Sequence, residues 1–154
     1  MQHIAIMSKT RGSISKIVNR EKQIESRWYR NKLSPLGKIS NNDVIFFKHS
    51  GGLVVAKAEV SRFQEFYNIN NYQVTKLLAR YANKICLNKR QQNQILSKKP
   101  RNVILIWLKN PKNIEPVKIC KKNTSQRCAW LTVNNINDVT DKNSSPRPGS
   151  LNVA

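Results

Sequence analysis

An apolar run in the second half of the chain constrains the fold more than any other segment. Residues 103–108 read VILIWL, six positions without a polar side chain. A run of this kind is typical of a strand at the centre of a sheet, because both of its faces are covered there. We therefore predict a central, doubly covered strand at this position.

Other segments have the patterns of outer strands. Residues 22–29 alternate, with Ile24 and Trp28 on the face opposite to Glu25 and Arg27. The sequence HSGG at residues 49–52 is expected to close a hairpin, and Pro111 with Asn113 is expected to turn the chain after the central strand. We predict six strands besides the central one, at residues 3–7, 22–29, 43–48, 53–60, 115–119 and 128–133.

Two segments have helical spacing. Ser13 is predicted to begin a short helix that ends near Arg20. Residues 72–86 form a longer pattern, with apolar residues on one face. A basic stripe runs along this second helix, in steps of four residues: Lys76, Arg80 and Lys84.

Short strands with two inserted helices predict a single α+β domain built as a small β-barrel with flanking helices. This domain is expected to span residues 1–133. Residues 134–154 contain little apolar material, so we predict a disordered tail.

The charge of the chain points to its partner. There are 28 Lys and Arg residues against 8 Asp and Glu residues, a formal net charge of +20. The predicted tail is neutral, so the whole excess belongs to residues 1–133 and the expected partner is a polyanion, above all nucleic acid. The alternative is a Lys-rich solvated surface caused by a general bias of composition, which the abundance of Asn would fit.

Composition also disfavours several classes of protein. No apolar run approaches the roughly 20 residues that a membrane-spanning helix needs, and the N-terminal residues do not form a signal peptide. Three cysteines without a CxxC pair and two histidines do not suit a zinc site. We predict a cytoplasmic protein with reduced thiols, without a metal or small-molecule cofactor and without a membrane partner.

A family resemblance rests on short motifs in a fixed order. They are Arg20-Glu21-Lys22, the strand IESRWY at 24–29, Pro35 followed by Gly37-Lys38-Ile39, Asn42-Asp43, the turn at 50–52 and the closing segments VILIWLKNPKNIEPVKI and CAWLTV. In these motifs the chain resembles the ASCH family, which is related to PUA-like domains. The resemblance implies a PUA-like β-barrel with flanking helices and a cleft for nucleic acid, most often RNA. Asn19-Arg20 departs from the glycine that often ends the first helix of the family.

Known members of the family include nucleases and an amidohydrolase that acts on acetylated cytidine. The amidohydrolase pattern needs a Lys, a Thr three residues later and a Glu on the later helix. Lys22 matches the first position, but Glu25 stands in place of the Thr. The helix predicted at 72–86 contains no carboxylate, so an amidohydrolase acting on an acylated nucleoside is the weakest of the activities that the resemblance implies.

Strand 22–29 supplies the centre of the predicted site. Glu25 and Arg27 share one face of this strand and can form an ion pair. The pair is either a plain surface ion pair or an arrangement in which Glu25 orients Arg27 to bind a phosphate. Tyr29 is the better candidate for stacking on a base, because Trp28 shares the face of Ile24 and is expected in the core. The full predicted nucleic-acid site is Lys22, Glu25, Arg27, Tyr29, Lys48, Lys57, Lys76 and Arg80. Further basic residues at 89–101 are expected to contact phosphates from a loop.

The preferred hypothesis is a nucleic-acid-binding module with a basic cleft for unpaired or modified nucleotides, RNA being favoured over DNA. The alternative is a metal-independent ribonuclease that uses Lys22, Glu25 and Arg27 as catalytic groups in the same cleft. A basic adaptor that binds proteins is a third possibility, for which the sequence offers no motif.

Overall fold

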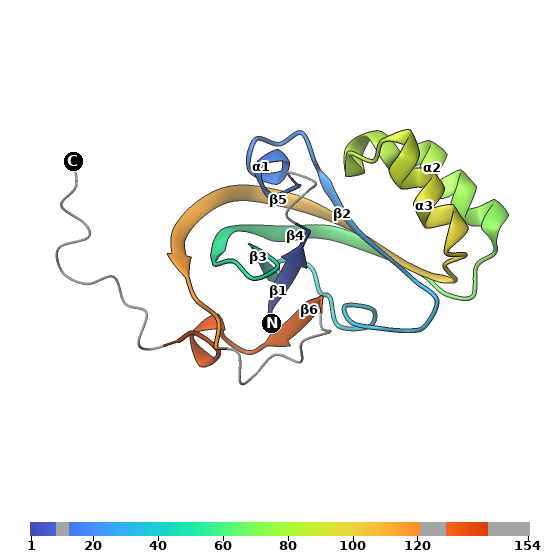
Figure 1. Cartoon of the computed structure of the whole chain (residues 1–154). Coiled ribbons are helices and arrows are strands. Elements are labelled where there is room, and N and C mark those ends of the chain that lie inside the picture. Colours follow the sequence, from blue (N-terminus) through green and yellow to red (C-terminus); the bar gives the residue numbers. More distant parts are fainter. Residues whose placement is uncertain (9–12, 121–128, 142–154) are drawn as a thin grey trace.

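A six-stranded sheet curls into a half-barrel at the centre of the molecule (Figure 1). The computed structural model describes residues 1–8, 13–120 and 129–141. The strands are β1 Gln2–Met7, β2 Ile24–Tyr29, β3 Val44–His49, β4 Val54–Phe66, β5 Asn102–Val117 and β6 Trp130–Val133. They lie in the order β2-β5-β4-β3-β1-β6, with β1 and β3 parallel and the other neighbours antiparallel. The predicted α+β class is confirmed.

Three helices flank the sheet: α1 Ser13–Val18, α2 Asn71–Ile85 and α3 Lys89–Ser97. α2 and α3 lie together over one end of β2 and β5 (Figure 1). α1 and α2 were predicted, but the prediction of a loop at residues 89–97 was wrong. The reason is local: Asn88 and Gln91 form a reciprocal capping box that satisfies the first amides of α3.

β4 and β5 are longer than the sequence predicted. A turn was expected at Pro111, with a separate strand at 115–119, but β5 continues to Val117. The register between the two strands shifts at this point, so that three steps along β5 oppose two along β4. Asn110 adopts a left-handed conformation there, and the resulting bulge accommodates Pro111, which has no amide to donate.

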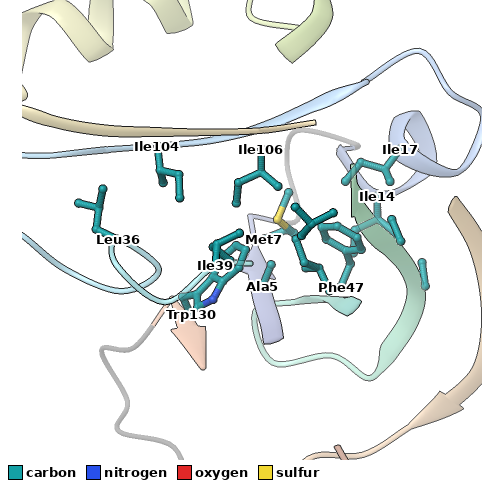
Figure 2. Close-up of a cluster of buried hydrophobic side chains, with 14 residues drawn as sticks. Ala5, Met7, Ile14, Ile17, Leu36, Ile39, Phe47, Ile104, Ile106 and Trp130 are labelled. Carbon is teal, nitrogen blue, oxygen red and sulfur yellow. The ribbon is translucent and has the colours of Figure 1, made fainter. Parts of the chain in front are cut away.

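Two layers of core explain the apolar run in β5. Ile104 and Ile106 point into the hollow of the half-barrel, where they join Phe47, Met7 and Trp130 (Figure 2). The intervening Val103 and Leu105 pack under α2 in a second cluster. The prediction of a doubly covered central strand is therefore confirmed.

The first residues of the predicted tail are ordered. Ile136–Asp138 forms a single turn of 3₁₀ helix, named η3, and Val139 is buried beside it. Thr140 forms an isolated bridge with Ile119. The prediction of disorder from residue 134 was therefore wrong for residues 136–140. The rest of the predicted tail, residues 142–154, lies outside the described residues. Residue 128, the first residue of the strand predicted at 128–133, also lies outside them.

A buried histidine joins β1 to β6. Nε2 of His3 lies 2.8 Å from Oδ2 of Asp43, and the indole N–H of Trp130 donates to Nδ1 of His3 at 3.2 Å. Because an indole N–H only donates, Nδ1 accepts and the ring hydrogen on Nε2 points to Asp43. Burial lowers the pKa of the His3 imidazole, which the neighbouring Asp43 opposes only in part.

This histidine is expected to make the fold sensitive to mild acid. Since the folded pKa lies below the unfolded value of about 6.5, the unfolded state takes up the proton first as the pH falls. The free energy of unfolding should therefore decrease as the pH falls from about 7 through the unfolded pKa of the imidazole. Urea titrations should show a flatter pH profile for His3→Gln than for wild type. An unchanged slope in His3→Gln would contradict the assignment.

Candidate nucleic-acid interface

A cleft of about 360 Å³ lies where α1, β2, the end of β1 and the α2–α3 pair meet. This volume is in the range of pockets that hold one small organic molecule. Among its described lining residues four are positively charged and one is a carboxylate: Lys16, Lys22, Arg27, Lys98 and Glu25. The cleft therefore concentrates positive charge around a single acidic group.

That acidic group, Glu25, is the centre of a buried ionic triad. Its Oε2 lies 3.0 Å from Nζ of Lys22, and its Oε1 lies 3.4 Å from Nε of Arg27. Glu25 is 3% exposed and Lys22 is 7% exposed. The sequence predicted that Glu25 and Arg27 would pair, but a plain surface ion pair does not describe a contact from which water is so largely excluded.

Local backbone contacts hold the triad in place. The amide of Lys22 donates to the carbonyl of Lys16 at the end of α1, and the amide of Gln23 donates to the carbonyl of Lys84 in the last turn of α2. The start of β2 is thus pinned between two helices. Strand alternation then directs Glu25 and Arg27 towards the cleft and Ile24 into the core under α2.

The two cations decide the charge of Glu25. Burial alone would raise the pKa of its carboxyl, but the Lys22 ammonium and the Arg27 guanidinium outweigh burial and hold that pKa below its usual value. Glu25 is therefore ionised at neutral pH, and the triad carries a net charge of +1. A carboxylate in this state can position cations, and it is a poor general acid.

Arg27 reaches across the open side of the half-barrel. Its guanidinium donates to the carbonyl oxygens of Ala129 and Ile6, at 3.3 and 3.5 Å. Its Cζ also lies 5.2 Å from the ring centroid of Trp130. These contacts fix the guanidinium on the wall of the cleft, where a bound anion could approach it.

Two aromatic side chains complete the wall. Trp28 and Tyr29 both line the cleft, although they lie on opposite faces of β2. The Trp28 indole N–H donates to Oγ of Ser26 at 2.9 Å, and the Tyr29 hydroxyl donates to the carbonyl of Ser34 at 3.0 Å. Trp28 packs partly against the core under α2, as predicted, and it still presents surface to the cleft.

The arrangement of strands and helices is also found in a bacterial protein of known structure. The crystal structure of ASCH from Zymomonas mobilis superposes with a TM-score of 0.66 over 91% of this chain and 96% of that one, at 14% sequence identity. A single-residue variant of the same protein superposes with a TM-score of 0.67, over 89% and 91% of the two chains, at 14% identity. This chain has the ASCH fold. Neither a protein-family model nor a curated protein matches the sequence.

Within this ASCH fold, the predicted site residues fall into two groups. Lys22, Glu25, Arg27 and Tyr29 come together in the cleft. The other four lie outside its lining: Lys48, Lys57, Lys76 and Arg80. Strand alternation places Lys48 on the same face of β3 as Phe46. It places Lys57 on the face of β4 opposite to Ala56 and Ala58. Lys76 and Arg80 line a separate groove beside α2.

Sequence reasoning missed the contribution of the helices to the cleft. α1 supplies Ser13 and Lys16, and α3 supplies Gln91 and Gln94, with Lys98 at its C-terminal cap. The signal for α3 is the pair Asn88 and Gln91, three residues apart, which matches the spacing of a capping box. Nothing in the sequence indicates that α3 folds back over β2.

Within residues 1–8, 13–120 and 129–141, no group of three or more His, Cys, Asp and Glu side chains is placed to hold a metal ion. In the same ranges no helix has both the length and the apolar character that a membrane crossing requires.

Proposed function

We propose that the cleft binds single-stranded RNA and holds one unpaired or modified nucleotide. The observation that supports this most is the buried triad, in which Glu25 presents two cations at the wall of a cleft of nucleoside size. A cation that is already fixed loses little side-chain entropy when it contacts a phosphate. The net charge of +20 would draw any polyanion towards this face.

The other lining residues fit the same ligand. Lys16 and Lys98 stand on the two helices that border the cleft and are suited to backbone phosphates. Trp28 and Tyr29 offer surface for a base, and stacking on an aromatic ring is worth about 1–3 kcal/mol per base. Gln91 and Gln94 can donate and accept hydrogen bonds at base edges.

Binding should be steeply dependent on salt. For labelled single-stranded RNA in EDTA, the logarithm of the association constant should fall linearly with the logarithm of salt concentration, by about 0.7 for each phosphate neutralised. The double variant Lys16→Gln/Lys98→Gln should bind more weakly, with a slope reduced by about 1.4. Fluorescence anisotropy measures both quantities.

The matched control is Lys57→Gln/Lys112→Gln. It removes the same charge, but its two lysines oppose each other across β4 and β5 and do not line the cleft. An equal loss of affinity in the control would contradict a specific role for the cleft, and no binding even at low salt would refute the proposal. A DNA oligonucleotide of the same sequence tests the expected preference for RNA.

The state of the RNA after the same incubation in EDTA distinguishes an RNA-binding module from a ribonuclease. Lys22 and Arg27 are placed to stabilise charge on a phosphate, which is the feature that the ribonuclease alternative requires. Because Glu25 is ionised and held by both cations, it is better suited to positioning than to donating a proton. RNA that stays intact in EDTA would support the binding module, and fragments that accumulate there would favour the ribonuclease.

A further inference from the structure

A second basic surface lies beside α2, away from the cleft. A groove of about 460 Å³ runs between this helix and the end of β4, with an apolar floor of Phe66, Ile69 and Leu77. Lys76 and Arg80 form one rim, and they belong to the basic stripe found in the sequence. The cleft uses neither of these residues, so the stripe requires a separate explanation.

A row of contacts between arginines and aromatic rings begins at Arg80 and continues outside the lining of the groove. Cζ of Arg62 lies 3.6 Å from the ring centroid of Trp107. The rings of Trp107 and Tyr81 meet edge to face, with their centroids 5.4 Å apart. Cζ of Arg80 lies 5.1 Å from the Tyr81 ring. The row therefore runs from an arginine through two rings to a second arginine.

The cations of the groove are available to an outside ligand. Arg62, Lys76 and Arg80 are exposed, and within the described part of the chain none of them forms an ion pair with a carboxylate. The residues that line the groove include no acidic side chain. Arg62, which lies outside the lining of the groove, is exposed over the Trp107 ring, and an arginine guanidinium can itself stack on a base.

The groove and the cleft lie at different points along α2. Arg80 lines the groove and Ile85 lines the cleft, five residues apart, which is about 7.5 Å along the axis of a helix. Lys84 lies between them in sequence, and its carbonyl accepts from Gln23, next to Lys22 of the triad. One exposed basic residue therefore stands on α2 between the residues that line the two sites.

We propose that the groove binds a second stretch of the RNA strand whose first nucleotide occupies the cleft. The inference rests on the proposed function, and it assigns the partner as a single strand that extends past the C-terminal end of α2. The observation that carries it is a groove with an apolar floor, bordered by the exposed cations Lys76 and Arg80 and without a carboxylate among its described lining residues. Surfaces that bind single strands combine positive charge for the phosphates with apolar surface for the bases. An acidic amphipathic peptide is the competing occupant.

The test compares two lengths of random-sequence RNA on the full chain. An oligonucleotide of about 4 nucleotides is near the lower limit of single-strand site sizes and should fill only the cleft, whereas one of about 12 nucleotides should reach the groove. Lys76→Gln/Arg80→Gln should weaken binding of the longer RNA at least about tenfold and reduce its salt slope by about 1.4. It should leave the affinity for the shorter RNA unchanged. Both positions are exposed on α2, and glutamine is a good helix former.

Each result has a defined meaning. If the variant binds the longer RNA like wild type while Lys16→Gln/Lys98→Gln binds it weakly, the groove proposal is overturned and the proposed function stands. Equal losses for both lengths would overturn the groove as a separate site. If wild type binds neither RNA, both proposals fail.

The competing occupant is tested in parallel with a labelled helical peptide of Glu and Leu. Binding of this peptide that is lost in Lys76→Gln/Arg80→Gln, together with unchanged affinity for the longer RNA, would overturn the proposal in favour of a protein partner. A selective loss of the longer RNA, with little effect in Lys57→Gln/Lys112→Gln, would support it.

Discussion

Glu25→Ala is expected to lower the free energy of unfolding by about 3–5 kcal/mol, because it leaves the buried Lys22 and the half-buried Arg27 without their counter-ion. Lys22 and Arg27 would then repel each other in a region from which most water is excluded. Urea unfolding at neutral pH, followed by circular dichroism, measures the change. For a domain of this size a loss of that order removes a large part of the total stability.

The pH dependence identifies the origin of this loss. Since the folded pKa of Glu25 lies below its unfolded value, its contribution to stability is complete above the unfolded pKa of about 4.3 and disappears as the pH falls through the folded value. The difference between wild type and Glu25→Ala should therefore narrow in strong acid. Glu115→Ala, which changes an exposed carboxylate on β5, serves as control and should cost little. A comparably small loss in Glu25→Ala would show that water screens the triad.

Replacing the whole triad is expected to separate stability from binding. In Lys22→Met/Glu25→Leu/Arg27→Met the buried charges disappear together, and exchanges of this kind are often neutral or stabilising. We expect the triple variant to be more stable than Glu25→Ala. RNA affinity should nevertheless fall more than about 100-fold, because two charge-assisted contacts of about 1.5 kcal/mol or more each are removed.

The triple variant is compared with wild type by the same urea and anisotropy measurements. RNA binding as tight as in wild type would show that the cleft is not the site, however stable the variant is. A triple variant less stable than Glu25→Ala would show that the charges themselves support the fold, most directly through the contacts of Arg27 with the carbonyls of Ala129 and Ile6.

Much of the sheet could be predicted because its strands carry local patterns. The run at 103–108 identified the central strand, and the alternation at 22–29 placed Glu25 and Arg27 on one face. What could not be predicted depends on contacts between distant segments. The continuation of β5 past Pro111 needs a bulge opposite β4, and the sequence around a proline reads equally well as a turn.

The candidate site was predicted in part for the same reason. Lys22, Glu25, Arg27 and Tyr29 lie within one short segment, so strand geometry alone groups them. The cleft around Glu25 is also lined by α1 and α3, and α3 was not recognised as a helix. Lys48 and Lys57 carry the same charge as the cleft residues, but strand alternation places their side chains on faces that do not line the cleft. The charge of a residue alone does not show on which face of the sheet its side chain lies.

The reach of Arg27 links ligand binding to the integrity of the half-barrel. β2 and β6 are the two outermost strands of the sheet, and among the described residues no ladder of main-chain hydrogen bonds joins them. Instead, the Arg27 guanidinium on β2 crosses the open side of the half-barrel and donates to the carbonyls of Ala129 and Ile6. A ligand that moves the Arg27 side chain towards itself is expected to weaken the contact between β2 and the edge formed by β1 and β6. Amide hydrogen exchange along β6, which does not line the cleft, should then respond to ligand binding. A substitution of Arg27 is therefore expected to change the closure of the half-barrel together with ligand affinity.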